Sequence, residues 1–338
     1  MTPFPKLTAH ERTPTMKKRL LALLLLAVLL LPTAACDSGQ TPADTRPDTS
    51  APEATAEPTT PAETQPETDP ATDPETTAPE TEPETEPPLG TTELDKSKTY
   101  KILFVGNSYT YCNDMPTRYF GEIMEAAGYN VKILSLTKGG WTLSGSANSQ
   151  DELGKEVDMA LTHQKFDFVI LQEQSMTPAV NAGSFYGGVR RLNKKIRESG
   201  GIPVLYATWG RKQGSGDLTA TGLTAETMTW KLAASYEHMG QTHDIPVAHV
   251  GLAFWDIVQN ERRVNLFDND LSHPNAAGSY LAALTIFARI TGVDPTTVDY
   301  EGGVGSNIEP ILKEAARKAV FETPEIPEEY MAEAARRR

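Results

Sequence analysis

The sequence predicts an α/β domain built on a five-stranded parallel sheet with helices on both faces. Beyond residue 99, short apolar runs alternate with longer amphipathic stretches, which is the pattern of strands alternating with helices. The runs are almost continuously apolar, as over residues 166–171, and such runs are typical of strands that are covered on both sides. Both observations predict three layers, with the sheet in the middle.

The expected strands and helices follow one another from residue 96 to residue 321. The strands are expected at residues 100–106, 130–136, 166–171, 202–207 and 246–250. The helices are expected at residues 115–127, 151–162, 185–198, 225–243 and 275–291, with a last helix at 308–321 and a charged, frayed tail at 322–338. In open parallel sheets ligands bind beyond the carboxyl ends of the strands, so the segments that follow the strands are the candidate site.

The first 36 residues predict an export signal. Three basic residues precede an apolar run at residues 20–31, and small residues lead from it to Cys36. The run is shorter than the ~20 residues that span a bilayer. Small residues before a cysteine are typical of a bacterial lipobox, so Cys36 is expected to carry a lipid, although a plain signal peptide cleaved before it is the alternative. Residues 1–15 are interpreted as an upstream extension before a natural start at Met16.

Residues 37–95 predict a disordered, extended stalk. The whole chain has a formal net charge of −14, and residues 37–90 alone hold 14 acidic side chains and 1 basic side chain. These residues are mainly Thr, Pro, Glu, Asp and Ala. Such a segment has too few apolar side chains to form a core. The region beyond it is only mildly acidic, and no basic cluster indicates a nucleic-acid partner. The expected location is therefore outside the cytoplasm at a bacterial cell surface, with the lipid on Cys36 as the only membrane contact.

Two distant segments supply the residue types of a serine nucleophile's site. Ser108 follows the first predicted strand, and Asp270 precedes His273 by three residues in front of a predicted helix. A serine hydroxyl needs an imidazole to accept its proton and a carboxylate to orient that imidazole. A carboxylate three residues before a histidine can bond one ring nitrogen and leave the other for Ser108. The plainer interpretation is that Ser108 shapes a turn and that Asp270 and His273 cap the helix.

Donors for an oxyanion are expected beside Ser108. Its own backbone amide and that of Gly140, in a Gly-Gly loop after the second strand, are candidates, although such a pair can simply form a turn. After the third strand, Gln172 and Gln174 place two side-chain amides at the same edge. Either of them can supply a third donor, and a strand-end network facing solvent is the alternative.

Three large side chains after the second and fourth strands are candidates for substrate binding. Trp141, Trp209 and Arg211 can line a sugar or acyl pocket, although plain packing explains a strand-end tryptophan equally well. The other histidines lack metal-ligand spacing, so no metal and no cofactor are expected.

These blocks, in this order, resemble the SGNH (GDSL-like) hydrolases, especially secreted bacterial members whose first block reads Gly-Asn-Ser-[Tyr/Phe]-Thr. The resemblance covers residues 99–291 and implies a flavodoxin-like three-layer α/β/α domain. It implies that Ser108 is the nucleophile and first oxyanion donor, that Gly140 is the oxyanion glycine, and that Asp270 and His273 form the Asp-x-x-His block.

Two departures from the family pattern concern the first and third blocks. Asn107 replaces the usual aspartate before the serine. The third block, usually Gly-x-Asn-Asp, starts at Gln172 and reads Gln-Glu-Gln-Ser. Gln174 aligns with the family's oxyanion asparagine, whereas Gln172 aligns if the chain follows the Gln-Gly-Glu pattern of related acetyl esterases.

The resemblance implies a serine esterase that acts on acyl esters, with acetyl groups on carbohydrate as the expected substrate. A lipid or thioester hydrolase is the enzymatic alternative. A surface glycan-binding protein that keeps the fold without turnover is the alternative from another class.

Overall fold

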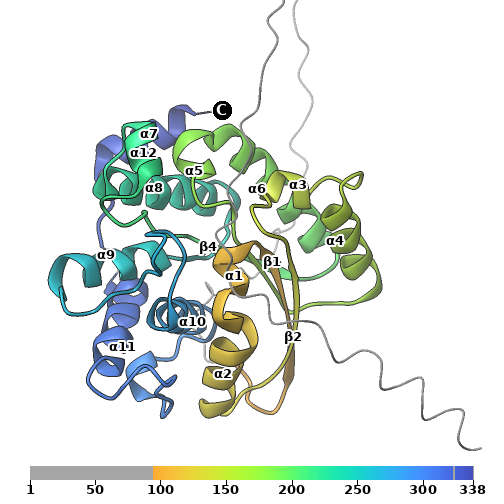
Figure 1. The fold of residues 1–338 in the computed structure, drawn as a ribbon. Helices are drawn as coiled ribbons and strands as arrows, with labels where there is room; N and C mark the ends of the chain where they lie inside the picture. The colour runs from red at the N-terminus through yellow and green to blue at the C-terminus, as the bar shows by residue number, and fades with distance from the viewer. Residues whose placement is uncertain (1–93, 323, 338) are drawn as a thin grey trace, which may run out of the picture. The chain divides into compact units, whose positions relative to one another are not determined.

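A five-stranded parallel sheet forms the centre of the fold in a computed structural model, which describes residues 94–322 and 324–337 (Figure 1). The strands are β1 (Thr99–Gly106), β2 (Asn130–Thr137), β3 (Phe168–Leu171), β4 (Ile202–Tyr206) and β5 (Val247–Ala248). Their order is β2-β1-β3-β4-β5, which is the flavodoxin-like order. The predicted fold class is confirmed, whereas the predicted signal peptide and the stalk up to residue 93 lie outside the described residues.

The register of the strands brings the ends of β1, β2 and β3 together. Gly106 pairs with Thr137, and Val105 pairs with Leu171. The segments that follow these three strands therefore begin side by side at one edge of the sheet. The chain winds in opposite directions on the two sides of the β1/β3 boundary, and ligand sites form at such a switch point.

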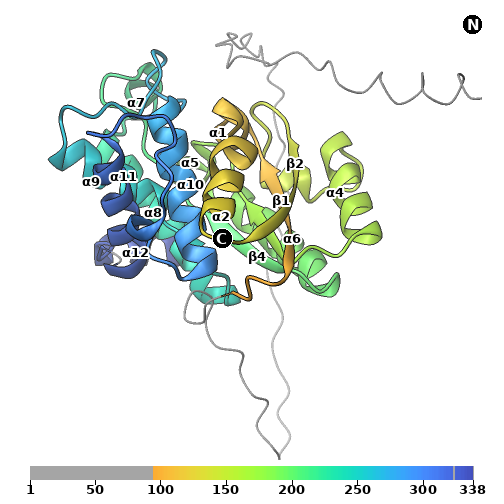
Figure 2. The same cartoon turned by 90° about the horizontal axis from the view of Figure 1, so that it is seen from below.

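Helices cover both faces of the sheet, because successive side chains of each strand point to opposite sides. Ile102 and Phe104 of β1 pack into one core cluster, and Leu103 and Val105 pack into the other. The first face is covered by α2 (Glu122–Ala126), α9 (Val250–Asn260), α10 (Ala276–Thr291) and α11 (Glu309–Arg317). The second is covered by α4 (Glu152–His163), α6 (Ala182–Glu198) and part of α8 (Ala225–His243). Figure 2 shows α2 and α10 on one side of the sheet and α4 and α6 on the other.

Short elements complete the described residues. The helices among them are α1 (Ser108–Tyr111), α3 (Leu143–Ser146), α5 (Thr177–Val180), α7 (Gly216–Thr221) and α12 (Glu328–Arg336). Two short 3-10 helices are η1 (Cys112–Asp114) and η3 (Pro295–Thr297), and two short π-helices are η2 (Met115–Gly121) and η4 (Lys318–Glu322). No helix in the described ranges is long and apolar enough to cross a membrane.

Two parts of the chain differ from the sequence-based expectation. The strand expected to run to residue 250 pairs only over Val247–Ala248, and the apolar residues that follow form α9 instead. The tail expected to be frayed forms α12, because Tyr186 donates to the carbonyl oxygen of Ala334 at 3.1 Å and Lys231 forms a 2.6 Å ion pair with Glu333. Charged side chains near the end of a chain can thus hold a helix against the domain instead of only facing solvent.

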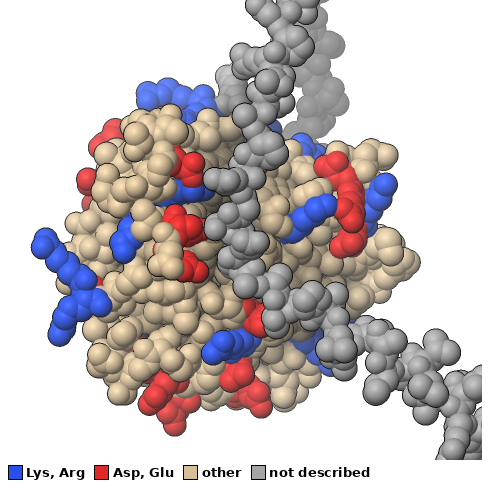
Figure 3. Space-filling model, in the orientation of Figure 1, with Lys and Arg blue, Asp and Glu red and all other residues tan. Residues whose placement is uncertain are grey.

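The surface in Figure 3 shows positive and negative side chains scattered among neutral ones. No extended area of one sign is visible on the described part of this face. The charge pattern of this face therefore does not single out a strongly charged ligand.

Candidate active site

Ser108 begins α1 directly after β1, at the switch point of the sheet. The side chain of Asn107 caps this helix by accepting a hydrogen bond from the backbone N–H of Tyr109 at 3.2 Å. Gly106 has no side chain because a Cβ there would lie 2.5 Å from Oγ1 of Thr110 and 2.6 Å from Oε1 of Gln172. The glycine in the first block thus allows close packing against β3.

The loop between Asp270 and His273 folds back on itself. Oδ1 of Asp270 accepts hydrogen bonds from the backbone N–H groups of Ser272 at 3.0 Å and His273 at 2.9 Å. Leu271 adopts a φ of +62°, a left-handed conformation that a non-glycine side chain disfavours. This conformation lets Oδ2 of Asp270 accept a hydrogen bond from Nδ1 of His273.

The structure brings Ser108, His273 and Asp270 into one chain of hydrogen bonds. Nε2 of His273 lies 2.7 Å from Oγ of Ser108, while Nδ1 of the same ring faces Asp270. Burial raises the pKa of Asp270, but hydrogen bonds from His273 and from two backbone N–H groups outweigh burial and hold the pKa below its ordinary value. An ionised carboxylate, an imidazole and a hydroxyl are thus arranged so that the imidazole can accept the hydroxyl proton.

A second link joins the same two segments through the residues adjacent to Ser108 and His273. The hydroxyl of Tyr109 lies 2.7 Å from Oγ of Ser272. The indole N–H of Trp209 donates to the carbonyl oxygen of Ser272 at 3.1 Å. The rings of Tyr109 and Trp209 stack with centroids 4.5 Å apart, and the ring of His273 meets Tyr109 edge-on at 5.5 Å. Sequence reasoning missed Tyr109 and Ser272, although both lie inside the motif blocks.

The three candidates for substrate binding have different environments. Trp209 is 0% exposed and is packed between Tyr109 and Phe254, which favours the packing interpretation. Trp141 is half-buried under the ammonium group of Lys138, 4.4 Å from its ring. Arg211 bonds Oγ of Ser175 at 3.2 Å and forms an ion pair with Asp217.

The two backbone N–H groups expected to bind an oxyanion, those of Ser108 and Gly140, have no hydrogen-bond acceptor within the described residues. Ser108 is the first residue of α1, so its N–H has no partner within the helix. Gly140 has a φ of +69° in the loop after β2. In the described part of the chain neither N–H makes a hydrogen bond, so both are available to a ligand.

The two glutamines of the third block have separate surroundings. Gln172 is 1% exposed, and its Oε1 accepts from the N–H of Asn107 and the hydroxyl of Thr110, both at 2.8 Å. Its amide nitrogen donates to the carbonyl oxygen of Glu173. Oε1 of Gln174 caps α5 by accepting from the N–H of Met176 at 2.9 Å, while its amide nitrogen has only a 3.4 Å contact with Ser175. Neither glutamine is hydrogen-bonded to Ser108 in the described structure.

Comparison with known proteins gives matches at the level of structure alone. The chain matches no protein-family model and no curated protein. It is similar to a proposed SGNH hydrolase from Slackia heliotrinireducens, with 28% identity and a TM-score of 0.50 over 57% of this chain and 99% of that chain. The chain has the fold of an SGNH hydrolase. A DUF4886 family protein from Bacteroides uniformis shares this fold, with 20% identity and a TM-score of 0.58 over 69% of this chain and 99% of that chain.

The SGNH hydrolase resemblance seen in the sequence blocks is therefore confirmed by the structure. The first of these two similarities also supports a hydrolase. Sequence identity is low, so the specific activity has to be argued from the site itself.

Glu173 lies between the two glutamines of the third block and is not among the predicted site residues. Its carboxylate is fully buried and accepts from the N–H of Gln174 at 2.7 Å and of Leu143 at 3.2 Å. Burial raises the pKa of Glu173 to about 7, although these N–H groups lower it. Because Asn107 also donates to the carbonyl oxygen of Trp141 at 2.9 Å, the loop that carries Gly140 is held from two sides.

No group of three or more His, Cys, Asp or Glu side chains that could hold a metal ion occurs in residues 94–322 and 324–337. His249, one of the histidines outside the candidate site, is buried and pairs with Glu237 at 2.8 Å. Its contact is thus a hydrogen bond within the core of the fold.

Proposed function

We propose that the chain is a serine esterase that hydrolyses acyl esters, most simply acetyl esters, on carbohydrate. The observation that carries this proposal is the hydrogen-bonded series Ser108, His273 and Asp270 at the carboxyl edge of the sheet. The similarity to a proposed SGNH hydrolase supports the hydrolytic class.

The reaction proceeds through an acyl-enzyme. Oγ of Ser108 attacks the ester carbonyl carbon while Nε2 of His273 takes the hydroxyl proton. The negative charge on the former carbonyl oxygen is held by the N–H groups of Ser108 and Gly140 and by the amide of Gln174. When the bond to the alcohol breaks, His273 returns the proton to the leaving oxygen. A water then attacks the acyl group by the same steps, and Asp270 keeps the imidazole in the required tautomer throughout.

Carbohydrate is proposed as the alcohol part of the substrate because the expected signal and stalk would hold the domain at a cell surface. The proposed lipid on Cys36 is tested by replacing Cys36 with alanine in the full chain. Release from the membrane fraction without detergent is expected for this variant, and unchanged retention would count against the anchor.

The test of the activity compares the full chain with Ser108→Ala on p-nitrophenyl acetate. We expect a loss of at least ~10³-fold in kcat/KM. Ser97→Ala is the matched control. It removes an exposed serine hydroxyl that donates a hydrogen bond to Asp95, and it should keep full activity. A fluorophosphonate should label Ser108 and should fail to label the alanine variant. Equal hydrolysis by the chain and by Ser108→Ala would refute the proposal.

The acyl group is tested with a series of esters. Acetate esters should be cleaved faster than octanoate esters, and acetylated oligosaccharides faster than acetyl thioesters. Preference for octanoate would favour the lipid alternative instead.

A further inference from the structure

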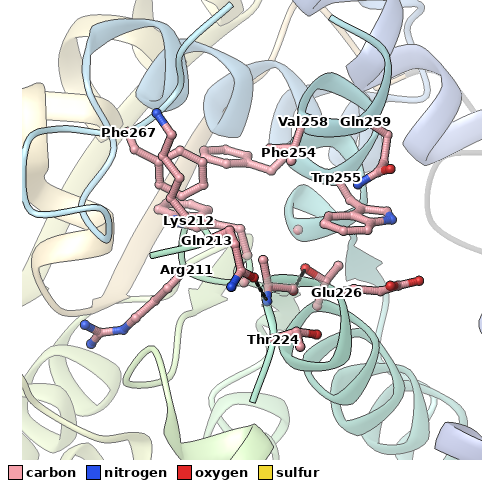
Figure 4. A pocket seen from close by; sticks show the side chains of 15 residues that line it. Arg211, Lys212, Gln213, Thr224, Glu226, Phe254, Trp255, Val258, Gln259 and Phe267 are labelled. Carbon is pink, nitrogen blue, oxygen red and sulfur yellow. Dashed lines mark hydrogen bonds between the residues drawn. The ribbon is translucent and has the colours of Figure 1, made fainter. Parts of the chain in front are cut away.

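A cavity lies next to the loop that carries His273, and it is separate from the candidate active site because neither Ser108 nor His273 lines it. It has a volume of about 430 Å³, within the range of roughly 300–1,000 Å³ that is typical of small-molecule sites. Residues after β4, the start of α8 and one face of α9 enclose it. Figure 4 shows how their side chains converge on this space.

The cavity has a buried aromatic floor and a partly exposed aromatic rim. Phe254 and Phe267 are buried and meet edge-on with centroids 5.8 Å apart. Trp255 is only half-buried, and its indole makes no hydrogen bond in the described structure. The half-buried indole of Trp255 therefore offers a ring face that a ligand can cover, beside a floor of buried phenyl rings.

Polar groups lie beside the half-buried tryptophan. Figure 4 shows the indole of Trp255 between the side chains of Gln259 and Glu226, while Arg211 points away from it. Gln259 and Glu226 are exposed, and neither side chain has a hydrogen-bond partner among the described residues. Oε1 of Gln213 accepts from the N–H of Ala225 at 3.1 Å, which leaves its amide nitrogen to donate to a ligand.

We infer that this cavity binds a glycosyl unit, with Trp255 as its platform. A sugar ring carries C–H groups on its faces and hydroxyl groups around its rim, so it needs an aromatic face with amide and carboxylate groups beside it. An acyl chain would leave these polar groups unused, whereas the hydroxyl groups of a sugar can form hydrogen bonds with them. The combination found at Trp255 therefore fits a sugar better than a lipid.

The cavity is connected to the candidate active site through the backbone. The N–H of Lys212, on the cavity wall, donates to the carbonyl oxygen of Leu271 at 2.9 Å. Trp209 forms part of the same wall from behind and bonds Ser272. The cavity and the candidate active site therefore adjoin the same loop. Under the proposal, a polymer that crosses this loop places one sugar in the cavity and a neighbouring acylated sugar at Ser108. This geometric role rests on the proposed esterase function, whereas sugar binding itself does not.

The test measures binding to the full chain carrying Ser108→Ala, so that no ester hydrolysis is required. Unsubstituted xylo-, cello- and chito-oligosaccharides are titrated by isothermal calorimetry, with decanoate as an acyl-chain probe. We expect saturable binding of at least one oligosaccharide series. Trp255→Ala should weaken it by at least about tenfold, Trp255→Phe should weaken it less, and Trp230→Phe should leave it unchanged.

Three results would overturn the inference. They are the absence of saturable binding by every oligosaccharide, an affinity that Trp255→Ala leaves intact, and saturable binding of decanoate alone. Thermal unfolding of each variant shows whether the fold is kept, and Trp255→Phe keeps the test valid if Trp255→Ala does not fold. Oligosaccharide binding without esterase activity would retain the sugar site and reject only the proposed reaction.

Discussion

Oε1 of Gln172 accepts the backbone N–H of Asn107 at 2.8 Å and so ties the end of β3 to the residue before Ser108. The same oxygen accepts the hydroxyl of Thr110. Gln172 therefore shapes the turn that presents Ser108, although the related acetyl-ester pattern would have made it an oxyanion donor. The side-chain amide nitrogen of Gln174, by contrast, makes only a 3.4 Å contact with Ser175 and can donate a further hydrogen bond.

Replacing Gln172 with alanine is expected to destabilise the domain by about 2–6 kcal/mol. The change leaves the N–H of Asn107 and the hydroxyl of Thr110 buried without an acceptor, and each such group costs ~1–3 kcal/mol. Urea unfolding measures the loss. A variant as stable as the original chain would show that this glutamine does not hold the turn.

Replacing Gln174 with alanine should instead lower kcat by ~10²–10³, which is the effect of removing one oxyanion donor. Gln174→Glu is the matched variant, because it keeps an oxygen that can cap α5 but removes the amide donor. Both variants should lose activity on p-nitrophenyl acetate, and Gln174→Glu should lose at least as much as Gln174→Ala, because its carboxylate also repels the oxyanion. Full activity of Gln174→Glu would assign the oxyanion to the backbone amides alone.

Ionisation of Glu173 is expected to make stability fall as the pH rises. The pKa of Glu173 is raised to about 7 in the folded state, from an ordinary value of 4.5. The folded protein thus keeps a proton that the unfolded chain loses between these pH values. Its contribution is fully present below about pH 4.5, falls as the pH rises to about 7, and amounts to about 3 kcal/mol.

Glu173→Gln should lack this component of the pH dependence. The difference in free energy of unfolding between variant and original chain should therefore shift in favour of the variant by about 3 kcal/mol from pH ~4.5 to pH ~8. Parallel unfolding curves at both pH values measure it. A constant difference would mean that the pKa of Glu173 is the same in the folded and unfolded chain.

The indole N–H of Trp209 is expected to position His273 through Ser272. Trp209→Phe keeps a ring between Tyr109 and Phe254 but removes the donor to the carbonyl oxygen of Ser272. We expect kcat to fall by about tenfold with little change in KM, because a buried acceptor loses its partner at a cost of ~1–3 kcal/mol.

Tyr109→Phe, which removes the hydroxyl that meets Oγ of Ser272, tests the same loop from the other side. Because both groups hold one residue, the effects of Trp209→Phe and Tyr109→Phe should be less than additive in the double variant. Strict additivity of the two losses in kcat would indicate that they act independently of the His273 loop.

The sequence by itself determined the sheet, its parallel strands and the pairing of Ser108 with Asp270 and His273. These features depend on local pattern, since an apolar run specifies a covered strand and an Asp-x-x-His spacing lets a carboxylate reach the ring that follows it. The helical character of residues 328–336 escaped that reasoning because α12 is fixed by contacts with α6 and α8, far away in the chain.

Only the tertiary structure decided the different hydrogen-bond partners of the two glutamines, the burial of Trp209 and the link between Tyr109 and Ser272. Each depends on which side chain a distant segment places beside it: Gln172 meets Asn107 across 65 residues, and Tyr109 meets Ser272 across 163. A residue type and its position in a motif specify what a side chain can donate or accept. Packing determines whether that capacity is used within the fold or left for a substrate.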